Sequence, residues 1–594
     1  MSKPNPVFTD VAWSDSPKSW FDHSHKWEGT TDFAKLIPIY WDYFRPGDKI
    51  KGNLSVFGRS LPLKQPVYGD AYLHVDWFAV PLRLLWSNFT EYITGVKRTG
   101  VPVTHEYPSF TVSNKAEMPV TGEQGIQLMA ENTYGGYFTH GSLIDYLGGN
   151  TFCSAVRDVS GTRNYYGFTD SDSLSLATYD AMPMRAYCEI WNEYFRDEQL
   201  QDIIEFYDGD GEYPYNYAPQ AVKEQYTIQP VCAEKDRFTT SRPNPQFGEM
   251  ATAQSVVAGW FNGSGSYFTP GYKTLQVNAP EGGKLDNTIS FGNGAINVNL
   301  GPSVANLRAA ITLQHLLESR NVGGFRYFEQ VLSDFGVQMS DIRAQRPEFL
   351  GGDTVPFMIN SVTDSVNDPE SGSYLGEQAG QGMFSKNTDS IEYEANEDCI
   401  VMAVMFVRPR SFYYQNSRKQ FTLGIVQATE DVTSFADVAY KQTDWMDKFY
   451  NPKLQGLGDE AVYQFEVAQG HSDDDRSLND VFGYASQYSN WKTHPNEVHG
   501  EFKGTLNDWL YSRDLVYDTQ RTGVSLTDAV QMHANDYRHV YAYNANTSGL
   551  VPGSSRTDAV MNSSYNDHLL FDLSFNLEVR RSLEFYGTPG VGVV

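Results

Sequence analysis

Strand-like alternation of apolar and polar residues is strongest near the two ends of the chain. Between Ala71 and Val80 one face would carry Leu73, Val75, Trp77 and Ala79, and the other Tyr72, His74, Asp76 and Phe78. Between Leu569 and Val579 the apolar set is Leu569, Phe571, Leu573, Phe575, Leu577 and Val579. A repeat of two residues is typical of a β-strand with one buried face. Both segments are therefore predicted to be strands of a sheet.

Two further strands are predicted before residue 60. Residues 31–44 are rich in strand-forming side chains and end at the Pro-Gly turn Arg45–Asp48, after which Lys49–Arg59 forms the next strand. Strands at both ends of a long chain, with long excursions between them, indicate a sandwich whose loops carry large insertions. Because Greek-key folds bring first and last strands together, Lys35–Phe44 and Leu569–Val579 are expected in one sheet.

Helical periodicity is clearest in the segment Met182–Asp202. Apolar residues three and four apart would share one face, and polar residues would fill the other. The apolar face comprises Tyr187, Ile190, Trp191, Tyr194 and Phe195, and the polar face comprises Glu189, Asn192, Glu193, Arg196 and Asp197. Pro183 suits the first turn, because its missing N–H has no intrahelical partner there. The pattern is typical of an amphipathic helix packed on a core.

Two more helices and one unusual insertion are predicted in the middle of the chain. The helices are Leu307–Leu317 and Tyr327–Phe335, each preceded by glycine. The segment Gly248–Ser303 is rich in Gly, Ser and Asn, carries few charges and contains the strand-like runs Thr288–Phe291 and Ala295–Val298. It is interpreted as an inserted, surface-exposed β-rich loop.

The composition describes a folded protein with an acidic surface. The 594 residues include 73 Asp and Glu against 45 Lys and Arg, a formal net charge of −28. This balance repels nucleic acid at long range, which argues against a free-standing DNA-binding protein but not against a container with basic residues on one face. Hydrophobic residues make up 40% and aromatic residues 14%, enough for a sizeable core and large contact surfaces.

Cysteine usage and hydropathy indicate a protein made inside a cell. Cys153, Cys188, Cys232 and Cys399 are far apart and form no Cys-x-x-Cys pair, so buried thiols are expected rather than a zinc site or a disulfide framework. The start of the sequence lacks the apolar run of a signal peptide. No uncharged stretch of about 18 apolar residues occurs, so no membrane insertion is expected.

Motifs for catalysis and cofactor binding are missing from the sequence. There is no phosphate-binding loop, no His-Glu-x-x-His zinc helix and no Gly-x-Ser-x-Gly elbow. Asp208–Glu212 hints at a calcium loop but lacks the bidentate Glu at position 12, so an exposed acidic turn is favoured. Asp473–Asp475 is interpreted as a solvated loop. The 12 His show no metal-ligand spacing, and the 73 acids single out no glycosidase pair.

Seven segments occur in a fixed order along the chain. The most specific is Met182-Pro-Met-Arg-Ala-Tyr-Cys-Glu-Ile-Trp-Asn-Glu-Tyr-Phe-Arg-Asp197, and the longest is Leu307–Gly352, which contains Gln345-Arg-Pro-Glu-Phe-Leu-Gly-Gly352. The others are Phe21–His25 with Gly29–Asp48, Trp77–Trp86, Lys235–Gln246, Asp480–Tyr484 and Tyr586–Gly590. Together they resemble the major capsid protein of the Microviridae, small icosahedral single-stranded DNA phages, and most of all its gokushovirus branch. Residues 104–180 and 359–480 align poorly, which leaves surface detail open.

The resemblance implies a mainly β protein. The expected fold is an eight-stranded antiparallel jelly roll, with long inserted loops containing short helices, as a single domain over residues 1–594. Residues 248–303 would project from the outer surface and cluster by threes. Sixty copies would assemble in the host cytoplasm into a T=1 shell, the virion capsid, around circular single-stranded DNA. Expected partners are other copies, the genome, a small basic packaging protein, a minor pilot protein and a host surface receptor.

Six residues of the resembling segments are expected to support the fold or contacts between subunits. They lie in Tyr187–Phe195 and Arg343–Leu350, and are Tyr187, Trp191, Phe195, Arg346, Pro347 and Phe349. Large aromatic and Arg side chains usually dominate such contacts. No residue is predicted to be catalytic, to bind a metal or to hold a cofactor, and the sequence assigns no residue to DNA contact.

Two rival classes are consistent with parts of the pattern. A β-sandwich carbohydrate-active enzyme would account for the aromatics and the many acids, although the signal peptide and catalytic motifs expected of it are missing. A receptor-binding spike would form a trimer. Particle size separates the three, because a capsid protein gives a megadalton shell and the enzyme a monomer of 66.9 kDa.

Overall fold

The structure is a computed structural model, and it describes sixteen stretches of the chain. They are residues 18–112, 141–149, 156–157, 163–164, 177–211, 227–246, 288–291, 294–297, 304–363, 376, 378–414, 459–467, 481–486, 488–513, 526–541 and 567–583. The chain divides into two compact units, one of residues 1–243 with 340–594 and one of residues 244–339.

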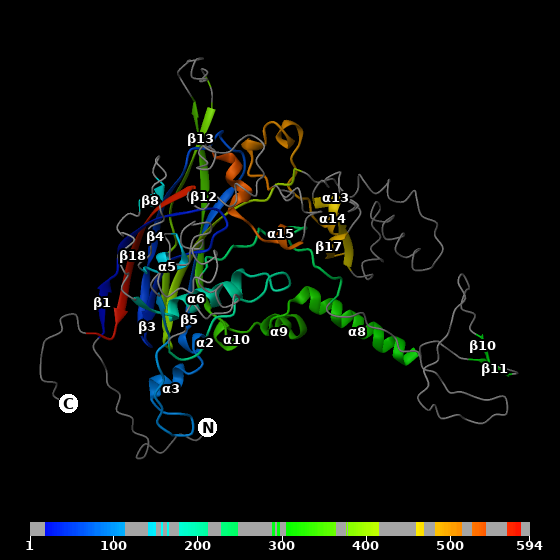
Figure 1. The fold of residues 1–594 in the computed structure, drawn as a ribbon, viewed down its shortest axis with the longest axis horizontal. Helices are drawn as coiled ribbons and strands as arrows, with labels where there is room; N and C mark the ends of the chain where they lie inside the picture. The colour runs from blue at the N-terminus through cyan, green and yellow to red at the C-terminus, as the bar shows by residue number, and fades with distance from the viewer. Residues whose placement is uncertain are drawn as a thin grey trace, which may run out of the picture. The chain divides into compact units, whose positions relative to one another are not determined.

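The larger unit holds one continuous antiparallel sheet (Figure 1), and eight of its strands form two four-stranded halves that are described below as two sheets. The first has the order β2 (His25–Thr31), β18 (Leu569–Arg581), β4 (Lys49–Ser60), β13 (Gln378–Asn387). The second has the order β3 (Ile37–Phe44), β15 (Cys399–Pro409), β5 (Ala71–Pro81), β12 (Glu348–Thr363). Strands from the beginning and end of the chain are interleaved in both sheets, which is the arrangement of a jelly roll. The predicted eight-stranded jelly roll is confirmed.

Hydrogen bonding continues from one sheet to the other, because β12 pairs with β5 over its first half and with β13 over its second half. Two short strands, β1 (Ser19–Asp22) and β14 (Ile391–Glu394), add to β18 and β4. The expectation that Lys35–Phe44 and Leu569–Val579 share a sheet is confirmed only in that both belong to this continuous hydrogen-bonded strand order. Strand β3 lies at one end of the strand order, and the rings of Tyr40 and Phe575 meet 5.9 Å apart across the core.

The main core lies between the two sheets. The apolar faces predicted for the strands at Ala71–Pro81 and Leu569–Arg581 both point into it and are buried. Gly58 of β4 is required there, because a Cβ atom would lie 2.6 Å from the ring of Phe571 and 3.2 Å from that of Phe384. Close approach of packed rings to a backbone is a common reason for glycine inside a strand.

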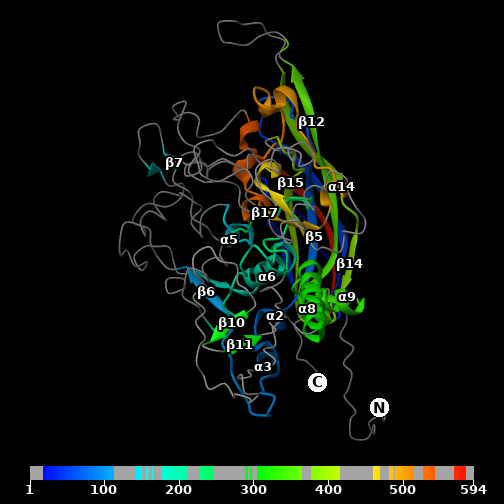
Figure 2. The ribbon, with the colours of Figure 1, turned by 90° about the vertical axis from the view of Figure 1, so that its right-hand side faces the viewer.

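A second core lies on the other face of β5 and β15, and it is covered by helices (Figure 2). The covering elements are α2 (Leu82–Leu85), α3 (Phe89–Thr94), α5 (Leu143–Tyr146), α6 (Met182–Ile190) and the π-helical turn η1 (Trp191–Phe195). Phe78, Val80 and Val404 supply the sheet side of this core. Strand β15 and the second half of β5 are therefore buried on both faces.

The remaining elements of the larger unit are short. They are the strand pairs β6 (Ser109–Val112) with β9 (Ala177–Asp180), β7 (Val156–Arg157) with β8 (Arg163–Asn164) and β16 (Asp459–Tyr463) with β17 (Val481–Ser486), and the helices α10 (Asp341–Ala344), α13 (Gln464–Val467), α14 (Ser489–Lys492), η5 (Gly500–Lys503), η6 (Asn507–Trp509), α15 (Leu526–Val530) and η7 (Ala534–Val540). Residues of β16, β17 and α15 surround a third, small core that includes Phe238 and Tyr413.

The smaller unit holds α8 (Val304–Gly323), α9 (Tyr327–Phe335) and the hairpin of β10 (Thr288–Phe291) and β11 (Gly294–Asn297). Both helices predicted here are confirmed, α9 with the same bounds. The hairpin confirms strands in the segment Gly248–Ser303, whose other residues lie outside those described, as do Cys153 and Asp473–Asp475. None of the helices in the described stretches is both long and apolar enough to cross a membrane.

Candidate subunit-contact site

The helix predicted over Met182–Asp202 is shorter than expected. An α-helix runs from Met182 to Ile190 with Pro183 in its first turn, and a π-helical turn continues it to Phe195. The amide of Arg196 donates to the carbonyl of Trp191 at 2.9 Å, five residues back, and Arg196 itself is extended. This wide turn ends the helix, which regular apolar spacing alone does not reveal.

Tyr187 and Trp191 are buried anchors of this helix rather than surface groups. The hydroxyl of Tyr187 donates to the carbonyl of Leu36 at 2.9 Å and accepts the amide of Gln229 at 2.8 Å. The indole N–H of Trp191 donates to the carbonyl of Pro230 at 2.9 Å, and the side chain is 3% exposed. The buried polar atoms of both side chains therefore have hydrogen-bond partners. These bonds hold the helix against the neighbouring segments that contain Leu36 and Pro230.

Polar residues on the opposite face of the helix are more buried than the sequence predicts. Asn192 belongs to the predicted polar face, but it is buried, and its side-chain amide makes two hydrogen bonds with the backbone of Ile204, at 3.0 and 2.9 Å. Arg185 is also buried and donates to the carbonyls of Leu85 and Gly209. Both side chains therefore form hydrogen bonds with backbone groups of the segments that cover the helix. Helical spacing in the sequence cannot reveal such contacts.

The two predicted segments meet at Tyr194. Its hydroxyl donates to the carbonyl of Pro347 at 2.6 Å, and the guanidinium of Arg346 lies 5.1 Å from the centre of its ring. Arg346 in turn pairs with Asp341 at 2.6 Å. The structure thus brings Trp191–Phe195 and Arg346–Phe349 together, although more than 150 residues separate Tyr194 from Pro347.

A β-bulge determines the direction of Phe349. Phe349 pairs with Phe78, but the next pair along β12 joins Gly351 to Trp77, so Leu350 is the extra residue. The bulge reverses the alternation, which places Phe349 on the helix side of the sheet while Val355 and Phe357 point into the main core. β-Bulges commonly redirect a side chain in this way.

A row of aromatic side chains results on the helix side of the sheet. Ring centres are 4.7 Å apart for Phe78 and Tyr194, 5.4 Å for Phe78 and Phe349, and 5.4 Å for Phe195 and Phe406. Phe78 and Phe406 are buried, whereas Phe349 is 46% exposed. We name Tyr194, Phe195, Arg346 and Phe349 the contact site, because they form the accessible end of this row.

Carboxyl groups near the contact site bind protons more tightly than usual. Burial, reinforced by repulsion from Glu193, raises the pKa of Glu189 to about 7. Burial also raises the pKa of Asp76 on β5 to about 6, although the nearby Arg408 lowers it. Desolvation penalises the charged form of a carboxylate, so both groups weaken the fold once they ionise.

The chemistry around the contact site is that of packing. The thiol of Cys188 is fully buried, and burial raises its pKa, which keeps it in the unreactive thiol form. Burial likewise raises the pKa of the Tyr187 and Tyr194 hydroxyls. Within the described stretches, no three His, Cys, Asp or Glu side chains are grouped so that they could hold a metal ion.

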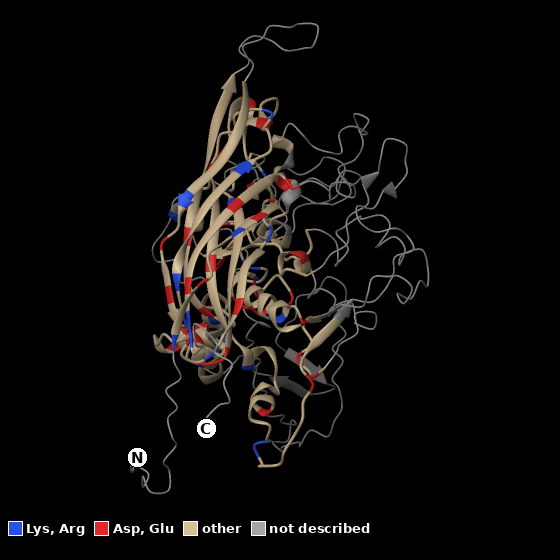
Figure 3. Cartoon of the chain, turned by 90° about the vertical axis from the view of Figure 1, so that its left-hand side faces the viewer, with Lys and Arg blue, Asp and Glu red and all other residues tan. Residues whose placement is uncertain are grey.

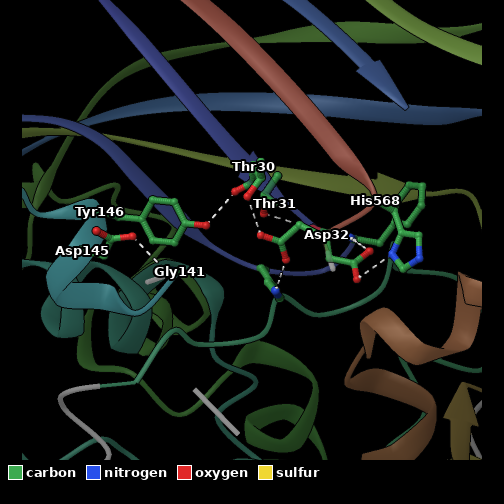
Figure 4. Close-up of polar contacts among 10 residues, drawn as sticks. Thr30, Thr31, Asp32, Gly141, Asp145, Tyr146 and His568 are labelled. Carbon is green, nitrogen blue, oxygen red and sulfur yellow. Dashed lines mark hydrogen bonds and ion pairs between the residues drawn. The ribbon is translucent and has the colours of Figure 1, made fainter. Parts of the chain in front are cut away.

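A polar cluster that sequence reasoning missed joins the two ends of the jelly roll (Figure 4). Asp32 Oδ2 lies 3.3 Å from His568 Nδ1, and both side chains are buried. Asp567 accepts the Thr30 hydroxyl at 2.8 Å and pairs with Lys35 at 2.7 Å. We name these five residues the polar junction. Because it links positions more than 530 apart in sequence, no local motif could reveal it.

The described part of the acidic turn, residues 208–211, also has a structural role. Asp210 accepts hydrogen bonds from Trp86 Nε1 at 2.7 Å and Asn88 Nδ2 at 3.1 Å, and it contacts His105 Nδ1 at 2.6 Å. The second His105 nitrogen lies 3.1 Å from Glu91. Hydrogen bonds to Asp210 and Glu91 raise the pKa of His105. The turn is exposed at Asp208, as expected, and Asp210 within it also ties helix α3 to two loops.

Comparison with known proteins relates this chain to viral capsids. The sequence model of the family described as "Capsid protein (F protein)" matches residues 10–117 and 159–591. "Capsid protein VP1" of Bdellovibrio phage phiMH2K is 26% identical over 532 residues, which cover 85% of this chain and 86% of the relative. The proteins of the same name from Chlamydia phage 1 and Spiroplasma virus 4 are 26% and 25% identical, over 85% and 97% of this chain and 88% and 95% of their own lengths. The chain therefore belongs to the capsid protein (F protein) family, the major capsid proteins of the Microviridae, whose role is structural rather than enzymatic.

Proposed function

We propose that 60 copies of this chain form a T=1 shell that assembles in the host cytoplasm around a circular single-stranded DNA genome. The observation that carries the proposal is the family match, which spans nearly the whole chain and agrees with the jelly roll. A closed shell needs several different contacts per subunit around its symmetry axes. The test is electron microscopy of the purified full-length protein: round particles of megadalton mass support the proposal, and a stable monomer or trimer at all concentrations contradicts it.

The contact site is proposed to form one of these subunit interfaces. Phe349 is an exposed aromatic side chain that packs on buried rings close to an Arg. Aromatic and Arg side chains are typical of the hot spots that dominate the binding energy of an interface. Phe349→Ala should therefore reduce assembly while leaving the melting temperature of the free subunit nearly unchanged. Val362→Ala is a matched control on the same strand, since Val362 is exposed and lies at the far end of β12. Normal assembly of the Phe349 variant would exclude this surface as an interface.

Packaging is proposed to depend on partners that supply positive charge. A net charge of −28 per subunit, times 60 copies, gives about −1,680, so bulk attraction cannot neutralise the genome. We propose that a small basic protein and cations do so, that a minor pilot protein accompanies the genome, and that the isolated subunit binds single-stranded DNA weakly. Tight binding by the isolated subunit at physiological salt would contradict this account.

Residues 248–303 are proposed to project from the outer surface, to cluster at threefold axes and to carry receptor contacts. The support is compositional, because a segment with low charge and many Gly, Ser and Asn residues suits an exposed loop. Its deletion should permit shell assembly and abolish attachment to host cells. Loss of assembly in the deletion variant would show instead that the segment belongs to the shell.

A further inference from the structure

The outward face of the sheet formed by β2, β18, β4 and β13 carries an unusual group of side chains. Charged residues of both signs are interspersed along this side of the sheet (Figure 3). Among them Phe57, Leu570 and Met358 are large apolar residues with 39%, 41% and 43% of their surface exposed. The guanidinium of Arg59 lies 5.1 Å from the centre of the Phe57 ring.

Strand register places these side chains in one patch. Leu570 pairs with Arg59, Arg59 pairs with Met383, and Met383 pairs with Met358. Phe57 is two residues from Arg59 on β4 and occupies the next row of the same face. Directly paired residues of antiparallel strands have their Cβ atoms about 5 Å apart. We name these five residues the outer-face patch.

The core beneath holds the outer-face patch in place. Gly58, between Phe57 and Arg59, points inward and is covered by the ring of Phe571. The Phe571 ring packs 5.3 Å from that of Phe384. A register slip would drive these rings into solvent, so Phe57 and Arg59 are fixed on the outward face.

Charge distinguishes Arg59 from its neighbours. Lys26 is paired with Asp572 at 3.3 Å, and Lys51 with Glu578 at 2.7 Å, on the same face. In contrast, no carboxylate of the described stretches lies within 4.0 Å of the Arg59 guanidinium. Within the described stretches, Arg59 is therefore a cation without a salt-bridge partner, and the carboxylate opposite Phe57, that of Asp572, is already paired with Lys26.

An exposed ring beside a free guanidinium suits one kind of ligand. Unpaired bases stack on aromatic side chains, and sheets that present such rings are common platforms for single-stranded nucleic acid. A duplex hides its base faces and cannot use them. We propose that the outer-face patch binds single-stranded DNA, with a base on Phe57, a phosphate on Arg59 and apolar contacts to Leu570 and the two Met side chains. This assignment rests on the proposed function, whose genome is single-stranded DNA.

A second ring on the same face sets the direction of the bound strand. Trp20 of β1 is exposed, with Lys51 Nζ 4.5 Å and the Arg580 guanidinium 5.8 Å from its ring. Six residues of β4 separate Lys51 from Phe57, a distance of about 20 Å. At 3.4 Å per nucleotide this corresponds to about six stacked nucleotides. A bound strand would therefore run along β4 from Phe57 toward Trp20.

The test uses the full-length subunit and a fluorescent 12-nucleotide oligo(dT), titrated at several low salt concentrations. Phe57→Ala should weaken binding by about fivefold to 100-fold, the effect of one lost base stack. Arg59→Ala should weaken binding and reduce the slope of log affinity against log salt by about 0.7, as for one lost phosphate contact. Phe57→Tyr, which keeps the ring, should bind like the wild type. Melting temperatures should not change, because the substituted side chains are exposed.

The outcomes separate this proposal from the proposed function. Wild-type affinity and salt slope in both Ala variants would overturn the outer-face patch as a DNA site, while shells that still contain DNA would leave the proposed function intact. Ala variants that bind DNA normally but fail to assemble would also overturn it, and would assign the patch to a subunit contact. A wild-type protein that neither assembles nor prefers single strands over duplex would overturn both.

Discussion

Substitution of Trp191 by Ala should strongly destabilise the subunit. The indole is 3% exposed and packs in the core between helix α6 and the sheet. Removal of a buried ring of roughly 200 Å² at about 25 cal/mol per Å² gives an upper bound near 5 kcal/mol. Truncations of buried Trp typically cost about 3–5 kcal/mol. Since folded domains are stable by roughly 5–15 kcal/mol, Trp191→Ala should prevent assembly.

Trp191→Phe separates packing from hydrogen bonding. Phe keeps most of the ring but leaves the half-buried carbonyl of Pro230 without its 2.9 Å donor. An unsatisfied buried acceptor costs about 1–3 kcal/mol, so this variant should fall between the wild type and Trp191→Ala. Trp491→Ala serves as the control, because Trp491 is 43% exposed and its loss should cost well under 1 kcal/mol.

The assay is urea unfolding of the free subunit, followed by fluorescence and far-UV circular dichroism, with particle formation scored separately. The expected order of midpoints is wild type with Trp491→Ala, then Trp191→Phe, then Trp191→Ala. A Trp191→Ala midpoint equal to that of the wild type would refute the reasoning, because the Trp191 ring would then contribute no packing energy to the core beneath the contact site.

Three further outcomes are expected. Glu189→Gln should raise the free energy of unfolding by about 2–3 kcal/mol above pH 7 and leave it unchanged below pH 4.5. The reason is that the pKa of Glu189 is raised to about 7 in the folded protein, so the wild type loses stability as this group ionises between these pH values. Urea midpoints at pH 4 and pH 8 measure the effect, and an equal gain at both values would contradict it. Gly58→Val should cost about 1–3 kcal/mol, because its Cβ meets the Phe571 ring. A melting temperature equal to that of the wild type would refute the close packing. Maleimide should label the partly exposed Cys232 before the fully buried Cys188 in the native subunit, as measured by peptide mass spectrometry. If Cys188 were modified first, helix α6 would have to open readily.

Elements with one buried face could be predicted from the sequence, and those shaped by distant partners could not. The strand at Leu569–Arg581 and the first half of the strand at Ala71–Pro81 alternate visibly, because one face points into the main core and the other is more exposed. The prediction for the helix that begins at Met182 was wrong in two respects, its end and the exposure of Asn192. Its end depends on a π-turn, and Asn192 is buried because the backbone of Ile204 supplies both partners of its amide. Neither cause leaves a periodic signal.

The contact site illustrates the same limit. Phe349, Val355 and Phe357 are spaced by even numbers, so simple alternation would place all three on one face of β12. The bulge at Leu350 reverses the face for Phe349 alone. The sequence could indicate that Arg346 and Phe349 matter, by resemblance, but not that they meet Tyr194. That meeting requires the folded positions of three segments.

The position of the last strand connects folding to assembly. Strand β18 is not an edge strand: it pairs with β4 along one side and with β1 and β2 along the other. The polar junction fixes the same strand to the beginning of the chain through Asp32 and His568. An incomplete chain therefore lacks an interior strand and leaves long open edges, which pair indiscriminately with other chains. Long-range pairing of this kind also forms late in folding. The contacts that close the jelly roll are therefore also the contacts that cover the edges of β4 and β2.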